Sequence, residues 1–321
     1  MPEAVIVNPF MHPDVIVHLR DDQEIVENRV TVGENHDMRL GAGAYTASAL
    51  KRQAWGVNIV DAIGDDIFGE YTFRESLAAG FGMDHVVRYQ GSHMFLLSVA
   101  DQKSRGGTMV SSCPPEWQRS AAEIESSISA APAADAFYIW SWFWSYANKN
   151  LCDLSTTHVL AEMRSKARLV VLDPNWKPPG RPPTKEVHEL VQSLSSVDIL
   201  KLNRRDAAVL IGEKDAEESV KELHGLGASI VVLTLGEQGC ALGGEGISGV
   251  EFVPSATNSP KHTTGAGDVF GGSFIARYEK HGDPLRAAEE ATHLVGEFLT
   301  NETGQRPDDD PVLLRERSTA L

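Results

Sequence analysis

The residues with the clearest chemical potential lie near the C-terminus, where the chain reads Gly265-Ala266-Gly267-Asp268 before an apolar helical pattern. Small residues let the backbone approach a ligand closely, and the free N–H groups at a helix start favour an anion. A carboxylate in the first helical turn would lie beside that anion, where it can take a proton from a hydroxyl that attacks a bound phosphate. For so short a motif, the alternative is a structural turn with an Asp that suits the helix dipole.

Alternating strand and helix patterns run along the chain and must position this motif. Helical patterns cover residues 44–52 and 71–79, and the second ends at Gly80, a residue typical of helix C-termini. Alternation of this kind implies βαβ units and a parallel sheet, whose ligands lie outside the carboxyl ends of the strands. The strands predicted for this sheet cover residues 5–7, 57–60, 136–144, 169–172, 199–202 and 230–235.

Two β-rich regions interrupt this alternation, at about residues 14–39 and 86–112. Together they predict a small β sheet that covers the ligand edge as a lid. An exposed sheet edge can pair with a second copy of the chain, which would give a homodimer through the lid. Charged residues in the same regions would instead favour a monomer.

Composition limits the classes of function. The chain has 321 residues, with 45 acidic and 29 basic side chains and a formal net charge of −16. This charge argues against binding to nucleic acid or to an anionic membrane surface. Three widely spaced cysteines favour neither a disulfide framework nor a zinc site. No apolar run approaches the length of a membrane span, and the N-terminus does not resemble a signal peptide, so we expect a cytoplasmic protein.

Further motifs precede Gly265–Asp268 in a fixed order. They are Asp14, Gly41-Ala42-Gly43, Gly64–Gly69, Asp173-Pro174-Asn175, Asn203-Arg204-Arg205-Asp206 and Thr234–Gly239. The ordered set resembles the ribokinase-like (PfkB-type) carbohydrate kinases over about residues 5 to 305. This resemblance implies an α/β fold with a doubly wound, mostly parallel sheet, flanked by helices and carrying a small β lid. It also implies a single domain over residues 1–321.

The resemblance assigns a role to each motif. It implies ATP and Mg²⁺ as cofactors and a small sugar or sugar acid as the substrate, with Asp268 as the base and the amides of Gly265, Ala266 and Gly267 as the anion hole. Lys177 and Arg105 are two candidates for neutralising the transferred phosphate, the alternative being that each is a solvated surface charge. The expected substrate-binding residues are Asp14, Gly41, Ala42, Thr46, Trp140, Asp173 and Asn175; the expected nucleotide-binding residues are Asn203, Thr234, Gly236 and Gly239; and Asp206 would bind Mg²⁺ through water.

The sequence departs from the family pattern at positions that select the substrate and the cation. Ala42 replaces a glycine, Thr46 replaces an Asn, and Asp206 replaces a Glu. His262 stands where many members have an Asp that helps to bind a monovalent cation, which argues against potassium activation. These departures leave two alternatives open, a nucleoside kinase on the same scaffold and a non-catalytic ligand-binding relative.

A tryptophan-rich strand pattern covers residues 138–144. At strand spacing Trp140, Trp142 and Trp144 share one face. Packing in the core is one interpretation of this face. The other is that a tryptophan forms a wall of the substrate pocket and stacks on a sugar or a base.

Overall fold

The computed structural model describes residues 1–7, 9–19, 33–100, 107–112, 121–140, 156–175, 184–257, 259–260 and 263–300. Eight strands form the main sheet, and the five pairings from β4 through β12 are parallel, whereas β13 and β14 are antiparallel additions at one edge. The mostly parallel sheet expected from the sequence is confirmed. Its order is β14 (Val250–Val253), β13 (Cys240–Gly244), β12 (Ile230–Thr234), β11 (Ile199–Asn203), β10 (Ala167–Asp173), β9 (Ala134–Trp140), β1 (Glu3–Val7) and β4 (Gly56–Val60).

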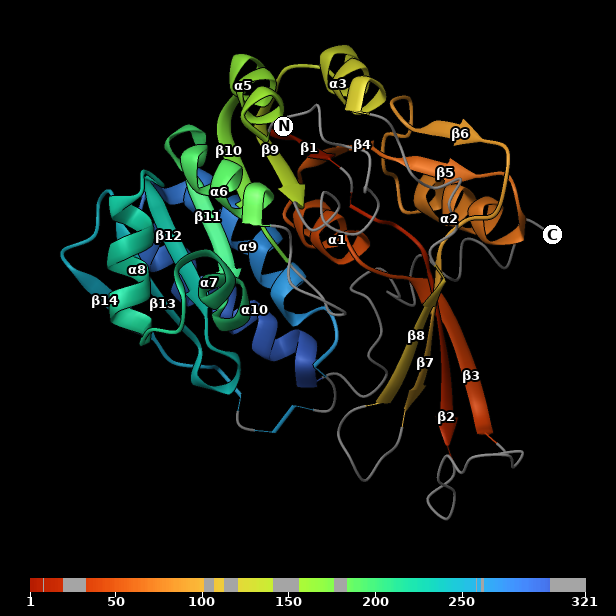
Figure 1. Ribbon diagram of the computed structural model, residues 1–321. Coiled ribbons are helices and arrows are strands. Elements are labelled where there is room, and N and C mark those ends of the chain that lie inside the picture. The colour runs from red at the N-terminus through yellow and green to blue at the C-terminus, as the bar shows by residue number, and fades with distance from the viewer. Residues whose placement is uncertain are drawn as a thin grey trace.

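Helices cover both faces of this sheet (Figure 1). Helix α9 packs against α1 and α10 behind the sheet, while α5, α6 and α8 lie in front of it. The central strands are buried on both sides and therefore consist of nearly continuous apolar residues. The helices are α1 (Ala44–Arg52), α2 (Ile67–Ala78), α3 (Ala121–Ala130), α5 (Thr156–Lys166), α6 (Thr184–Gln192), α7 (Arg204–Ile211), α8 (Ala216–Gly225), α9 (Ala266–His281) and α10 (Pro284–Thr300), with short 3₁₀ turns η2 (Leu194–Ser196) and η3 (Gly236–Gln238).

A second sheet of four strands extends away from the main body (Figure 1). Its order is β3 (Gly33–Leu40), β2 (Pro13–Leu19), β7 (Phe95–Ala100) and β8 (Gly107–Ser112). The predicted lid range of 86–112 starts too early. Residues 87–89 form β6 (Val87–Tyr89), which pairs with β5 (Ala62–Gly64) in a separate two-stranded sheet because the Val87 amide donates to the Asp61 carbonyl at 2.9 Å.

Helix α2 begins earlier than the predicted residue 71. Asp66 caps it, since its carboxylate accepts from the Gly69 amide at 2.9 Å, so the helix starts at Ile67. The predicted stop is confirmed, because Gly80 has a φ of 75° just after the last turn. Among the described residues, no helix is long and apolar enough to span a membrane.

Candidate active site

Four neighbouring strands end in residues that the sequence assigned to one site. Strands β9, β10, β11 and β12 finish at Trp140, Asp173, Asn203 and Thr234. The register places Asp173 opposite Trp140 and Asn203 opposite Thr234. Because these strands are parallel, the four residues meet at one edge of the sheet, which is where open α/β sheets bind their ligands.

The start of α9 carries the candidate base. Gly265 precedes the helix with a φ of 81°, in the left-handed region that favours glycine, and Asp268 lies in the first turn. The Val269 amide bonds to the Gly265 carbonyl at 2.9 Å, and the Ala266 amide donates to the Thr263 carbonyl at 3.3 Å. Of the three amides predicted for the anion hole, that of Ala266 is therefore engaged in a turn in this structure.

Helix α1 anchors this turn of α9. The Thr46 side chain is fully buried, and its hydroxyl donates to the backbone carbonyl of Asp268 at 3.1 Å. A Cβ at Gly272 would lie 2.6 Å from the Thr46 carbonyl, so the two helices touch through their backbones. The sequence predicted that Thr46 binds substrate; in the structure its hydroxyl donates to the backbone of the candidate base.

A buried polar network lies at the end of β10. One oxygen of Asp173, Oδ2, accepts from the Lys201 ammonium and from the Tyr138 hydroxyl, each at 2.7 Å. All three residues are buried. Burial lowers the pKa of Lys201, but the nearby carboxylates of Asp173 and Asp268 outweigh it and raise that pKa above its ordinary value. Burial, together with the charge of Asp173, raises the pKa of Tyr138 well above its usual range.

Asp14 lies in a second buried polar cluster, at the start of β2. It is only 3% exposed, and its Oδ1 is 3.0 Å from Nε2 of the equally buried His12. The two atoms are not aligned for a hydrogen bond, and neither bonds to another residue in the part of the chain that the structure describes. A Cβ at Gly41 would lie 2.2 Å from this carboxylate, so the first glycine of the hinge motif makes room for Asp14.

His93 supports the backbone beside this cluster. Its Nε2 lies 2.9 Å from the Met11 carbonyl, and its Nδ1 faces the Gly64 amide at 3.4 Å. The carbonyl can only accept and the amide can only donate, so the hydrogen bonds assign the proton to Nε2. Burial lowers the pKa of His93 to about 4, and the ring is therefore neutral near pH 7.

Two predicted substrate residues have a left-handed backbone that non-glycine residues seldom adopt. Ala42 has a φ of 54° and Asn175 a φ of 41°. Ala42 holds this conformation between two tight contacts, because the Gly41 amide donates to the His12 carbonyl and the Gly43 amide to the Pro9 carbonyl. Strained backbone of this kind is concentrated at ligand sites.

Trp140 belongs to the core. It is 1% exposed and packs on Phe10 with ring centroids 6.3 Å apart. The core interpretation therefore holds for this tryptophan. Trp142 and Trp144 lie outside the described residues, as do Lys177, Arg105 and His262.

Asn203 and Asp206 form a capping box at the start of α7. The Asn203 side chain accepts from the amides of Arg205 and Asp206, and the Asp206 carboxylate accepts from the Asn203 amide at 3.4 Å. Asp206 is fully buried, and its charge contributes to raising the pKa of Lys201. Mg²⁺ prefers oxygen ligands and usually keeps several waters, so this carboxylate fits a contact through water rather than a direct one.

The loop after β12 borders the same edge. The Thr234 hydroxyl donates to the Leu202 carbonyl at 3.2 Å, and η3 follows directly. Gly236 has a φ of 64° and open space where a Cβ would be, so the loop leaves room for a ligand on that side. Arg204 fixes the loop to α7, because its guanidinium donates to the Gln238 side chain at 2.7 Å. A Cβ at Gly239 would collide with the Val253 carbonyl, so this glycine has a packing role.

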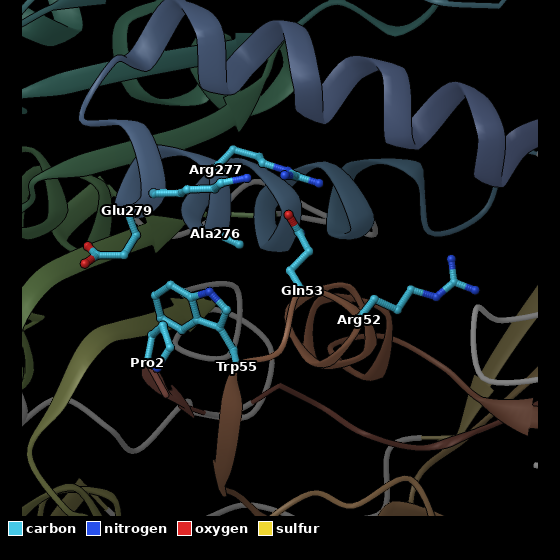
Figure 2. A pocket seen from close by; sticks show the side chains of 8 residues that line it. Pro2, Arg52, Gln53, Trp55, Ala276, Arg277 and Glu279 are labelled. Carbon is cyan, nitrogen blue, oxygen red and sulfur yellow. The ribbon is translucent and has the colours of Figure 1, made fainter.

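A cavity of about 470 Å³ lies at the other end of α9 (Figure 2). Two of its lining residues, Pro2 and Trp55, directly precede the parallel strands β1 and β4. The cavity therefore lies beside the amino ends of these strands, away from the edge where the strands end. The Arg277 side chain in this cavity forms an ion pair with Glu290 at 3.3 Å. Its positive charge also suits the C-terminal end of α9, where the helix dipole is negative. None of the predicted site residues that the structure describes borders it. The lining residues are Pro2, Arg52, Gln53, Trp55, Ala276, Arg277, Glu279 and Lys280.

Comparison with known proteins identifies the family. The sequence model described as "pfkB family carbohydrate kinase" matches residues 14–311, which is most of the chain. The chain belongs to the pfkB family of carbohydrate kinases. The expected family and the ribokinase-like fold are thereby confirmed.

Relatives within this pfkB family differ in the substrates that their names give. A cytidine kinase of Thermococcus kodakarensis is 31% identical over 127 residues, which cover 40% of this chain and 44% of that protein. A 2-dehydro-3-deoxygluconokinase of Dickeya dadantii is 24% identical over 83% of this chain and 87% of that protein. The chain therefore aligns with less than half of the first relative and with most of the second.

Solved structures share the pfkB fold. A fructokinase from Vibrio cholerae O395, with fructose, ADP and calcium ion bound, has a TM-score of 0.71 at 20% identity and covers 98% of each chain. The ribokinase of Arabidopsis thaliana, complexed with ribose and ATP, has a TM-score of 0.70 at 17% identity and covers 94% of this chain and 93% of that one. At these identities the likeness shows the fold alone.

Sequence reasoning missed four polar residues of this candidate site. Lys201 stands inside the apolar run of β11, and Tyr138 stands inside β9. His12 and His93 were among eleven scattered histidines. A charged residue in the middle of an otherwise buried strand was the one available signal, because such a charge needs a buried partner.

Proposed function

We propose that this chain transfers the γ-phosphoryl group of ATP to a hydroxyl of a small sugar or sugar acid, with Asp268 as the base. The observation that carries this proposal is the position of Asp268. It lies in the first turn of α9, behind the left-handed Gly265, where the dipole and free amides of the helix favour an anion. Family membership supports the type of reaction.

The residues around the start of α9 would have separate roles in the phosphoryl transfer. Asp268 would accept the proton of the substrate hydroxyl while that oxygen attacks phosphorus. The amides of Gly265 and Gly267, which make no hydrogen bond among the described residues, would hold the charge that develops on the phosphoryl oxygens. Thr234 and Gly236 would border the nucleotide phosphates. Bound Mg²⁺ would neutralise the charge of these phosphates, with Asp206 holding one of its waters.

Unpartnered buried atoms support a substrate with several hydroxyls. Among the described residues, His12 Nε2, Asp14 Oδ1 and Asp173 Oδ1 make no hydrogen bond although each is shielded from solvent; the first two face each other at 3.0 Å. Buried polar atoms without partners destabilise a protein by about 1 to 3 kcal/mol each, so a ligand that satisfies them binds favourably. A carboxylate can accept from two neighbouring hydroxyls at once, which suits a sugar or a sugar acid.

The substitution Asp268→Asn tests the base. We expect turnover to fall by a factor of about 10² to 10⁴, the usual contribution of a positioned base, while ATP binding and thermal unfolding stay near those of the parent protein. A coupled ADP assay and calorimetry with ATP and Mg²⁺ would measure both properties. The matched control is Asp84→Asn, at an exposed aspartate, which should keep full activity. Near-parental turnover in Asp268→Asn would refute the base assignment.

A nucleoside acceptor is the second candidate, favoured by the local match to a cytidine kinase. A panel of sugars, sugar acids and nucleosides, each with ATP, separates the two. Turnover confined to nucleosides would replace the sugar proposal. Binding of ATP without turnover on any member of the panel would favour a non-catalytic relative.

The four-stranded sheet would act as the lid and as the surface of a homodimer. Its apolar side chains Met38 and Val110 are 45% and 56% exposed. A second copy would cover them and the free strand edge. Sedimentation velocity measures the association, and a protein that stays monomeric at high micromolar concentration would exclude this dimer.

A further inference from the structure

Lys201 is a cation in the interior of an acidic protein. It is 6% exposed and lies in β11, one of the central strands. Its ammonium is held by Asp173 Oδ2 at 2.7 Å, and the Tyr138 hydroxyl bonds to the same oxygen at 2.7 Å. A buried ion pair adds little net stability compared with an apolar pair of the same volume. The fold therefore gives no stability reason for placing a charge here.

The first turn of α9 lies directly against this pair. A Cβ at Gly267 would be 3.3 Å from the Lys201 ammonium, and a Cβ at Gly271 would be 2.7 Å from the Tyr138 hydroxyl. The helix backbone thus approaches the network at two successive turns, and glycine at both positions permits it. The positive charge consequently lies against the helical turn that carries Asp268.

The charges of the site act on Lys201 from several elements. Burial opposes its protonation, whereas Asp173 from β10, Asp268 from α9 and Asp206 from α7 favour it. The net effect raises the pKa of Lys201, so the side chain stays positively charged over the working range. An electrostatic interaction is mutual: a carboxylate that stabilises the ammonium is stabilised in its ionised form by that ammonium.

We propose that Lys201 is a positioning residue for the phosphoryl transfer, locked by Asp173 and Tyr138 beneath the α9 start. Its charge keeps the Asp268 carboxylate ionised and ready to accept the substrate proton. The same charge offsets the negative charge of a phosphate held by the amides above it. This inference rests on the proposed function, since it assumes that Asp268 is the base.

The test compares Lys201→Gln with Lys201→Arg. Glutamine keeps hydrogen-bond donors near Asp173 but carries no charge, whereas arginine keeps the charge. We expect Lys201→Gln to lose at least about tenfold in kcat at pH 7 and to move the acid limb of kcat/KM upward by about one pH unit or more, because an opposite charge nearby shifts a carboxyl by about 1 to 3 units. Lys201→Arg should keep the acid limb at its parental position.

Tyr138→Phe is the control within the same network. It removes one hydrogen bond to Asp173 and changes no charge, so its acid limb should stay in place. If Lys201→Gln does not fold, the double variant Lys201→Met with Asp173→Asn replaces it, because this variant removes both charges of the buried pair. Its kcat with saturating acceptor is then compared with the kcat of Asp173→Asn alone. The inference is overturned if the acid limb of kcat/KM in Lys201→Gln stays at its parental pH. It is also overturned if the double variant has the same kcat as Asp173→Asn.

The two proposals fail in different ways. If Asp268→Asn keeps its turnover, the proposed base is wrong and the role of Lys201 falls with it. If Asp268→Asn is inactive while Lys201→Gln retains the parental pH profile, only the role of Lys201 is wrong.

Discussion

His93 makes the free energy of unfolding depend on pH between about pH 4 and pH 6.5. Burial of the ring holds its pKa at about 4, against 6.5 for an unburied histidine. The unfolded chain therefore binds a proton between these two values that the folded protein does not bind. Stability is complete above about pH 6.5 and falls as the pH drops toward 4.

The size of the effect follows from the shift. A difference of about 2.5 pKa units, at 1.36 kcal/mol per unit, limits the loss to about 3 kcal/mol, of which about 2 kcal/mol is lost by pH 5. This is a large part of the stability of an ordinary domain. The structural reason is that a charged ring would carry a proton on Nδ1, which now faces the Gly64 amide.

The substitution His93→Gln isolates this contribution. Unfolding in guanidinium chloride, followed by fluorescence and circular dichroism, gives the free energy of unfolding at pH 7.5 and pH 5.0. We expect the parent to lose about 2 kcal/mol more than His93→Gln between these two pH values. Comparing changes with pH removes any constant loss caused by the substitution itself. His293→Gln is the control, because that side chain is 72% exposed and should leave the parental pH dependence intact.

A parental pH dependence in His93→Gln would refute the reasoning. It would mean that the ring titrates near its ordinary value in the folded protein, or that the segment around Met11 opens before global unfolding. Coincident fluorescence and circular dichroism transitions distinguish these explanations, because local opening separates the two curves.

Two further predictions concern Gly41 and Cys240. In Gly41→Ala the new methyl would lie 2.2 Å from the Asp14 carboxylate, so we expect kcat/KM for the acceptor to fall at least about tenfold, consistent with an overpacking penalty of about 1 to 3 kcal/mol, while KM for ATP is unchanged. The control Gly225→Ala meets no atom within 4 Å, and equal effects in both variants would contradict the prediction. Burial raises the pKa of Cys240 to about 12, so iodoacetamide at pH 8 should label it only after denaturation; peptide mass spectrometry would detect labelling of the folded protein.

The strands of the main sheet were predictable because each is indicated by a pattern of neighbouring residues. Strands β10, β11 and β12 are short apolar runs that end in polar residues, and parallel pairing brings such ends together wherever the sheet forms. The α9 motif was predictable for a similar reason, since small residues followed by an Asp describe a helix start. Both inferences need only neighbouring residues and the handedness of βαβ units.

Contacts between distant segments were not predictable in the same way. Nothing near Thr46 indicates that its hydroxyl bonds to the Asp268 carbonyl, more than 200 residues away. The predicted second sheet began at about residue 86 because the whole region was assigned to one sheet, whereas residues 87–89 pair with β5, a partner that no local pattern indicates. Register and partner choice are tertiary properties, which propensity does not encode.

The glycines of α9 have one role that the sequence predicts and a second role that only the structure shows. Read along the sequence, they leave room for a ligand at the helix start. In the structure, Gly267 and Gly271 also leave room for Lys201 and Tyr138 on the protein side of the same turns. Glycine inside a helix destabilises it by about 1 kcal/mol relative to alanine. The two glycines face one buried network at successive turns, Gly267 at the Lys201 ammonium and Gly271 at the Tyr138 hydroxyl, which is the close contact that the proposed role of Lys201 needs.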